Sequence, residues 1–379
     1  IQISDVHDWG GVAAWARALF ESGGPSSREV QALAAGLAAN TSRPADRARA
    51  ALRWVQDNVR YVSLSFGESS HRPALPEVTL RRRFGDCKDK STLLVALLRE
   101  LGVEADLALV HSSRGAALMS KLPTYGAFDH VVVSVLVDQR RYWLDATRSY
   151  QRGELRDVSA GDLGFALLLR ADTRGLTAVD RYRDPRPEIE ARITYSAERM
   201  GSPVALRAEV SYVGNRAELV RGLRASLSPT ELTDTLAAPL RRAHDDLELV
   251  GDPEVTDDES SNQVIVTWQG KLADPWSKPD ALYEASMTIS PPWLAAVVPS
   301  VKPGRTAPRE SKTKRSDTAF ARLDVHDAVE RWKTAGSRIT WTIDYQTKGE
   351  RLAPHELGAL RETARAVDAE APRTVFRKR

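Results

Sequence analysis

The sequence has almost no cysteine: Cys87 is the only one among its 379 residues. A single cysteine excludes an internal disulfide bond and any zinc site built from several thiolates. His71 and His111 lack metal-ligand spacing with any partner, and no loop has the regularly spaced acidic residues of a calcium site. We therefore expect no metal and no other cofactor.

The sequence also lacks a long apolar run and an excess of charge of one sign. Apolar stretches such as DHVVVSVLV at 129–137 are far shorter than the roughly 18 to 20 residues of a bilayer-spanning helix. The 54 basic and 51 acidic residues give a formal net charge of +3, which gives no general reason to expect nucleic acid as a partner. With 42% hydrophobic and 28% charged residues, the composition predicts a folded protein of about two or three domains.

The first domain is expected at 1–182, with an α+β fold in which N-terminal helices pack on an antiparallel sheet. Apolar residues recur at helical spacing through the first 58 residues, and the clearest helix follows Cys87 and stops at Gly102. Strands are expected at 104–110, 128–137 and 141–146, and the last two form a hairpin. A charged, proline-containing stretch at 180–188 is the expected joint to the next domain.

The second domain, expected at 183–379, is predicted to be mostly β. Alternating stretches predict strands at 189–198, 204–214, 262–270, 281–290 and 338–349. Two helices interrupt them, one at 228–247 capped by Ser228 and one at 353–367. Residues 299–317 hold six basic and two acidic residues and predict an exposed basic loop, for which solvation is favoured over binding to an anionic surface.

Cys87 lies where its helix begins, in the charged stretch GDCKDK at 85–90. Unpaired N–H groups and the helix dipole favour a thiolate at such a position and offer a donor to an oxyanion. Lys88 adds positive charge, whereas Asp86 and Asp89 oppose it. Because burial is hard to reconcile with these charged neighbours, we expect an exposed, reactive Cys87 rather than an inert one.

A cysteine nucleophile needs a base, and the base needs an orienting group. Of the seven histidines, only His130 opens an apolar alternating strand, and Asp145 closes the next strand. A turn centred on residues 139 and 140 places both on the same face, but leaves them four residues, or roughly 13 Å, out of alignment. Contact therefore requires a turn one or two residues earlier, or a β-bulge. On these grounds alone, a purely structural role for His130 stays open.

The stretches RRRFGDCKDKSTLLVALLRELGV, FDHVVVSV and YWLDATRSY together resemble the core of the transglutaminase-like superfamily. The resemblance implies a papain-like core in which Cys87 is the nucleophile, His130 the base and acid, and Asp145 the group that orients the histidine. The superfamily includes proteases, amidases, acyltransferases and inactive members. The resemblance therefore implies a class of mechanism rather than a substrate.

Residues 60–84 and the form G-D-C-K-D-K-[ST]-x-L-L resemble more closely bacterial proteins in which a β-rich domain of unknown function precedes this core. Residues 1–20 resemble the segment just upstream of the core, so we expect that β-rich domain to be absent here. The sequence starts at Ile1 without a signal peptide, as expected of a processed product or a piece of a longer chain. The resemblance implies export in many members, and we expect an extracytoplasmic location, in the periplasm or cell envelope.

An oxyanion hole needs a second donor besides the backbone N–H of the nucleophile. The upstream candidates are Tyr61, Trp54 and Gln56, of which Tyr61 is preferred because it starts a short predicted strand. Glu68 and His71 lie in an irregular, proline-containing segment and are candidates to line the substrate cleft.

These residues predict a thiol-dependent enzyme that acts on amide bonds of peptides or proteins through a thioester, by transamidation or hydrolysis. The alternative is a non-catalytic binding or scaffold module, with the C-terminal domain holding a partner protein. Cys87, His130 and Asp145 together favour the enzyme, because a scaffold has no physical need for them. A sulfur near His130, with Asp145 on the far ring nitrogen, would support the enzyme, and a buried sulfur would support the module.

Overall fold

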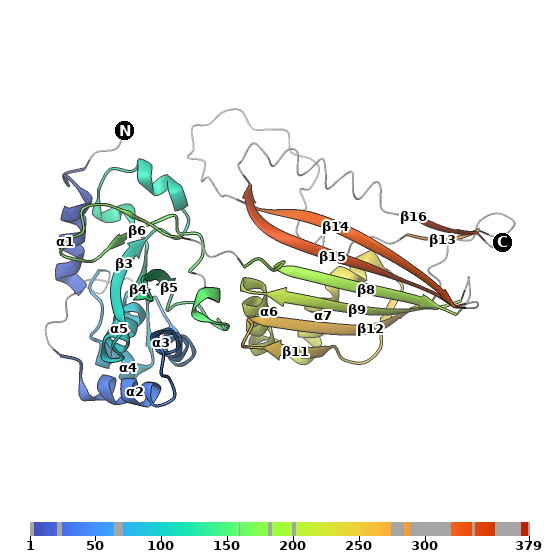
Figure 1. Cartoon of the computed structure of the whole chain (residues 1–379), viewed down its shortest axis with the longest axis horizontal. Coiled ribbons are helices and arrows are strands. Elements are labelled where there is room, and N and C mark those ends of the chain that lie inside the picture. The colour runs from blue at the N-terminus through green and yellow to red at the C-terminus, as the bar shows by residue number, and fades with distance from the viewer. Residues whose placement is uncertain are drawn as a thin grey trace. The chain divides into compact units, whose positions relative to one another are not determined.

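The computed structural model describes residues 4–20, 25–63, 71–158, 160–180, 184–198, 202–273, 284–288, 320–335, 338–352 and 373–377. The chain divides into two compact units (Figure 1). The N-terminal unit comprises Ile1–Asp184 and Glu259–Asn262, and the C-terminal unit comprises Pro185–Asp258 and Gln263–Arg379.

Helices pack against an antiparallel sheet in the described part of the N-terminal unit. The helices are α1 (Trp9–Phe20), α2 (Arg28–Ala38), α3 (Pro44–Asn58), α4 (Pro76–Arg82) and α5 (Cys87–Glu100), with 3-10 turns η2 (Gly115–Ser120), η3 (Tyr125–Ala127) and η4 (Leu155–Asp157). The sheet has the order β5-β4-β3-β6-β7, with β3 (Glu104–Val110), β4 (His130–Val137), β5 (Arg140–Leu144), β6 (Phe165–Leu168) and β7 (Thr177–Ala178). Apart from it, β1 (Arg60–Tyr61) pairs in parallel with β2 (Phe84–Gly85).

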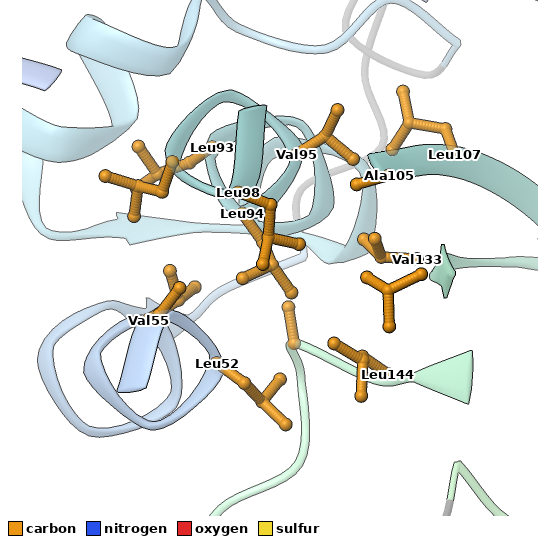
Figure 2. Close-up of a cluster of buried hydrophobic side chains, with 14 of the residues drawn as sticks. Leu52, Val55, Leu93, Leu94, Val95, Leu98, Ala105, Leu107, Val133 and Leu144 are labelled. Atoms are coloured by element: carbon orange, nitrogen blue, oxygen red, sulfur yellow. The ribbon is translucent and has the colours of Figure 1, made fainter. Parts of the chain in front are cut away.

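Helix α5 forms the centre of this unit. Figure 2 shows its Leu94 and Leu98 between Leu52 of α3 and the strand residues Val133 and Leu144, all of one buried cluster. Burying each such side chain contributes roughly 1.5 to 3 kcal/mol. The packing therefore holds α5 firmly against both α3 and the sheet, with its first residue, Cys87, at one end.

The start and the end of α5 follow from its sequence. The Asp86 side chain accepts hydrogen bonds from the N–H groups of Lys88 and Asp89, and the Asp89 side chain accepts one from the Asp86 N–H, which makes a capping box. Gly102, with φ of 71°, takes the left-handed conformation that commonly follows a helix. The helix boundaries therefore agree with those expected from the sequence.

The C-terminal unit contains a mostly antiparallel sheet with two helices against it (Figure 1). The main sheet has the order β10-β12-β9-β8-β15-β14, and β11 also pairs with β12. Its strands are β8 (Ile189–Ala197), β9 (Val204–Val213), β10 (Leu247–Leu249), β11 (Glu254–Asp258), β12 (Gln263–Leu272), β14 (Phe320–Ala335) and β15 (Arg338–Leu352). Helices α6 (Asn215–Ser226) and α7 (Pro229–Ala243) share a hydrophobic core with β8, β9 and β12. A separate pair joins β13 (Glu284–Thr288) to β16 (Arg373–Arg377).

The predicted α+β class, with a helical and antiparallel first part and a mostly β second part, is confirmed. Helix α7 begins at the capping box of Ser228 and Glu231, as its sequence indicates. Elements not predicted include helices α4 and α6, the short strands β6, β7, β10 and β11, and strand β14. Helix α6 was missed because it follows a strand directly and buries the charged side chains of Glu218 and Arg221, so its apolar face does not stand out in the sequence. The predicted helix at 353–367 and the basic loop at 299–317 lie outside the described residues.

Candidate active site

Cys87 is the first residue of α5 and is partly buried. Parallel pairing of β1 with β2 sets Tyr61 opposite Gly85, two residues before the cysteine. A Cβ atom on Gly85 would lie 2.7 Å from the Cβ of Asp89, so only glycine fits at this approach to the helix. The G-D-C sequence is thus explained by a tight entry followed by a capped helix start.

The charged residues around Cys87 are buried, contrary to the exposure expected from the sequence. Asp86, Lys88 and Asp89 are 6%, 7% and 8% exposed. The Lys88 ammonium donates to Asp86, and Asp89 accepts from the Arg82 guanidinium and, over 2.8 Å, from the backbone N–H of Ala74. Burial is possible because each charge has a partner of opposite sign and further hydrogen bonds. These charges therefore build the helix start rather than a solvated surface.

His130 and Asp145 are in contact: Nε2 of the histidine and Oδ2 of the carboxylate lie 3.0 Å apart. The hairpin turn is one residue earlier than the one assumed from the sequence, with Val137 paired to Arg140. Asp138 and Gln139 form the turn with φ of 50° and 60°, which suits the twist of a two-residue hairpin. Parity is unchanged and the misalignment falls from four residues to two, because Val133 pairs with Leu144.

Asp145 is held by several donors at the end of β5. Its Oδ1 accepts from the Thr147 N–H over 2.9 Å and from the Thr147 hydroxyl over 2.6 Å, and its backbone carbonyl accepts from Gln56 Nε2 over 2.9 Å. Burial alone would raise the pKa of Asp145, but hydrogen bonds from His130 and Thr147, with the attraction of His130, lower it. The carboxylate is therefore ionised at neutral pH and fixed toward the imidazole.

His130 is flanked by Asp145 on one side and Cys87 on the other. Burial favours its neutral form, but hydrogen bonds with Asp145 and Cys87 and the charges of both outweigh burial and raise the pKa of His130 to about 10. Because Asp145 occupies Nε2, Nδ1 is the ring nitrogen left for the cysteine. The arrangement can hold an imidazolium between a carboxylate and a thiolate.

The candidate oxyanion donors differ in their surroundings. The amide nitrogen of Gln56 donates to the Asp145 carbonyl and, over 2.7 Å, to Gln151 Oε1, so it braces Asp145 instead of facing the sulfur. The Trp54 ring lies under the guanidinium of Arg83 at 4.6 Å. Tyr61 is half-exposed; burial and the nearby Cys87, Asp86 and Asp145 raise its pKa, and a hydrogen bond with Ser63 opposes the shift. Of the upstream candidates, Tyr61 is therefore near the nucleophile, on the strand that pairs with the residues just before Cys87.

Of the two cleft candidates, only His71 lies among the described residues. Glu68 lies outside the described residues. His71 is exposed and makes an edge contact with Trp15 of α1, with ring centroids 5.8 Å apart, and Trp15 is 4.6 Å from the ring of Tyr125. His71 lies three residues before Ala74, whose backbone N–H donates to Asp89 in the first turn of α5. The segment that carries His71 therefore runs next to the turn that carries Cys87.

Sequence reasoning missed three residues that support this site. Thr147 could have been found, because an aspartate followed two residues later by threonine commonly forms such a side-chain turn. Gln151 and Lys90 carry no local signal, since their partners, Gln56 and the carbonyl of Val59, are far away in the sequence.

Residues 31–146, which hold Cys87, His130 and Asp145, match the model of the transglutaminase-like superfamily. This match confirms the resemblance to the transglutaminase-like superfamily that was found in the sequence. No curated protein matches the chain.

Two solved structures of low similarity were also found. A candidate protease from Parabacteroides distasonis has 8% sequence identity and a TM-score of 0.47, over 98% of this chain and 59% of that one. A candidate cysteine protease from Cytophaga hutchinsonii has 23% identity and a TM-score of 0.26, over 33% of this chain and 41% of that one. This chain thus spans less than two thirds of the length of either protein.

Proposed function

We propose that the chain is a thiol enzyme that acts on amide bonds of peptides or proteins through a thioester on Cys87. The single observation that carries the proposal is the series of contacts from Cys87 through His130 to the ionised Asp145. A buried carboxylate on one ring nitrogen and a thiol on the other is the arrangement that activates a cysteine nucleophile. The superfamily match over the same residues supports it.

In the proposed reaction, the Cys87 thiolate attacks the amide carbonyl carbon and forms a carbon–sulfur bond. The carbonyl electrons move to oxygen, and they return as the carbon–nitrogen bond breaks. His130 gives its proton to the leaving amine, while Asp145 keeps the ring oriented. Water or a second amine then attacks the thioester carbon and loses a proton to His130. The carbon–sulfur bond breaks, Cys87 leaves as the thiolate, and an acid or a new amide is released.

The negative charge on oxygen is stabilised, in this proposal, by two donors near the sulfur. Asp86 accepts from the N–H groups of Lys88 and Asp89. Among the described residues, no side chain accepts from the N–H of Cys87, because the N–H groups of a helix's first turn have no partner within the helix. We assign the second donor to the phenol of Tyr61, because β1 pairs it with Gly85, two residues before Cys87, and because burial and the nearby Cys87 raise its pKa.

Exposed apolar side chains around this end of the unit favour a peptide as the substrate. They come from β1, β2, the approach to α4 and the loop before β4, and comprise Tyr61, Leu75, Phe84, Met119, Leu122 and Tyr125. Among these, ring contacts join Tyr125 to Trp15 and Trp15 to His71, and an exposed apolar group of this kind suits the binding of a peptide side chain. We propose that the substrate cleft lies beside it.

The test is the pH dependence of Cys87 alkylation by iodoacetamide in the wild type and in His130→Ala. We expect rapid alkylation at pH 7, where an ordinary thiol is only a few per cent ionised, and a loss of roughly tenfold or more in the variant. His111→Ala is the control, since His111 has its own carboxylate, Asp129, at 3.4 Å. Equal, slow alkylation of all three proteins would instead support a non-catalytic binding module.

The extracytoplasmic location, also a proposal, is tested by cell fractionation.

A further inference from the structure

Lys90, one turn into α5, is a buried charged residue that the proposed reaction does not use. It is only 1% exposed. Among the described residues, its ammonium donates to the backbone carbonyl of Val59. A lysine is almost never buried to this extent unless a partner compensates for the lost hydration of its ammonium group.

The acceptor of Lys90 lies at the junction of α3 and β1. Val59 caps the C-terminal end of α3 in an extended conformation and is 1% exposed. The next two residues, Arg60 and Tyr61, are the whole of β1. So short a strand has few bonds of its own: the Arg60 N–H donates to Arg83 and the Val62 N–H to Gly85, each over 2.9 Å. A further anchor at Val59 therefore fixes where β1 begins.

We propose that Lys90 is a positioning residue, which ties β1 to the helix that carries Cys87 and so holds the Tyr61 phenol at the oxyanion. The inference rests on the proposed function and adds to it a residue that touches no substrate. A hydrogen bond from an ammonium group is roughly twice as strong as a neutral one, which suits a tether between two elements. Both ends lie in the same small region, because Lys90 is three residues after Cys87 and Val59 two before Tyr61.

The electrostatics of Lys90 agree with this placement. Burial lowers the pKa of Lys90 to about 8, while the carboxylates of Asp145 and Asp57 oppose the shift. The side chain therefore still carries its proton at pH 7 and lies in the field of the residue that orients His130.

The experiment compares two reactions of Cys87 that differ in their need for an oxyanion hole. Acylation by p-nitrophenyl acetate forms a tetrahedral oxyanion, breaks the ester carbon–oxygen bond and releases p-nitrophenolate. Alkylation by iodoacetamide displaces iodide from a saturated carbon and forms no oxyanion. In Lys90→Met we expect the acylation rate to fall roughly tenfold or more, up to the loss seen when an oxyanion donor is removed. Alkylation should stay within about twofold of the wild type.

Arg99→Met is the matched control. Arg99 is on the same helix and also donates to a backbone carbonyl, that of Ala105, but it lies about 13.5 Å further along the axis than Lys90, at 1.5 Å per residue. Both rates should be unchanged in this variant. A Lys90→Met effect shared by Arg99→Met would show general loosening of α5 and overturn the proposal.

The second arm asks whether Lys90 acts through Tyr61. Lys90→Met combined with Tyr61→Phe should acylate no more slowly than Tyr61→Phe alone, because the tether has nothing left to position. Multiplied losses, an unchanged acylation rate, or equal losses in acylation and alkylation would each overturn the proposal. Should Lys90→Met fail to fold, Lys90→Gln, which keeps an N–H donor without charge, is judged by the same two rates. Failure of the proposed function itself is distinct: wild-type alkylation would then not depend on His130.

Discussion

The two units bury polar groups in different ways. In the N-terminal unit they converge on the first turn of α5 and the end of β5. In the C-terminal unit they form separate pairs, such as Tyr195 with His244 at 2.8 Å and Arg221 with Asp257 at 2.8 Å. Separate pairs satisfy themselves and serve stability, whereas groups that converge on one nucleophile shift each other's charge states. The contrast supports placing the proposed active site in the N-terminal unit.

The largest effect is expected for Asp145→Asn. The amide keeps the shape of the side chain but removes the charge that orients and stabilises the His130 imidazolium. We expect acylation by p-nitrophenyl acetate to fall on the order of 10⁴-fold, measured by stopped-flow release of p-nitrophenolate.

The matched control is Asp129→Asn, which alters the other histidine–carboxylate pair of the same unit. The Asp129 carboxylate is 44% exposed and accepts from the Ser112 N–H and hydroxyl, beside His111 rather than beside Cys87. The acylation rate should therefore stay within about twofold of the wild type. Similar losses in both variants would mean that the acylation rate reports general stability and not the Asp145 charge.

A smaller effect, on stability alone, is expected for Asp257→Ala in the C-terminal unit. The Arg221 side chain is 7% exposed and would lose its carboxylate partner, which costs about 2 kcal/mol because Asp257 is itself partly exposed. Hydrogen exchange of the β9 and β12 amides should accelerate accordingly. Cys87 acylation should not change, and a matching loss of acylation would break the division of roles between the units.

The smallest effect is a difference in how the units respond to acid. Burial lowers the pKa of His244, with Asp245 and Asp246 opposing it, so protonation of the unfolded chain below about pH 6.5 destabilises the C-terminal unit. The slope is at most about 1.4 kcal/mol per pH unit. The raised pKa of His130 acts in the opposite sense: its contribution is fully present below about 6.5 and is lost as pH rises through about 10.

Hydrogen exchange at pH 7 and pH 5 measures this difference unit by unit. After correction for the slower intrinsic exchange at lower pH, acid should lower the protection of the β8 amides, on the strand that carries Tyr195, more than that of the β4 amides, on the strand that begins at His130. His244→Gln should remove most of the acid response of β8. A response of β8 that persists in this variant would assign the acid sensitivity to carboxylates instead.

Much of the candidate site could be predicted from local patterns. The leucine stripe and Asp86 mark a helix that starts at Cys87, because capping and helical spacing are local properties. His130 and Asp145 were placed on one face by the period-2 alternation of strands, which holds for either position of the turn. The structure confirms the fold class and brings His130 to Asp145, and their chemical roles stay predictions.

Other features could not be predicted, because they depend on partners distant in the sequence. The turn lies at Asp138 and Gln139, which both adopt left-handed conformations, although the pair lacks the glycine that usually marks such a turn in a sequence. The charges around Cys87 looked solvated, and only the approach of α4 and of Ala74 supplies the partners that allow Asp89 to be buried.

The sequence by itself determined where the helix of the site begins and ends and that His130 and Asp145 lie on the same face of their strands. It did so because caps, turns and periodicity act over a few residues. Only the tertiary structure decided the register of the hairpin, the burial of the charged turn and the tether from Lys90 to Val59. Those depend on packing between elements, where the free energy of a buried charge is set by neighbours that no local pattern contains.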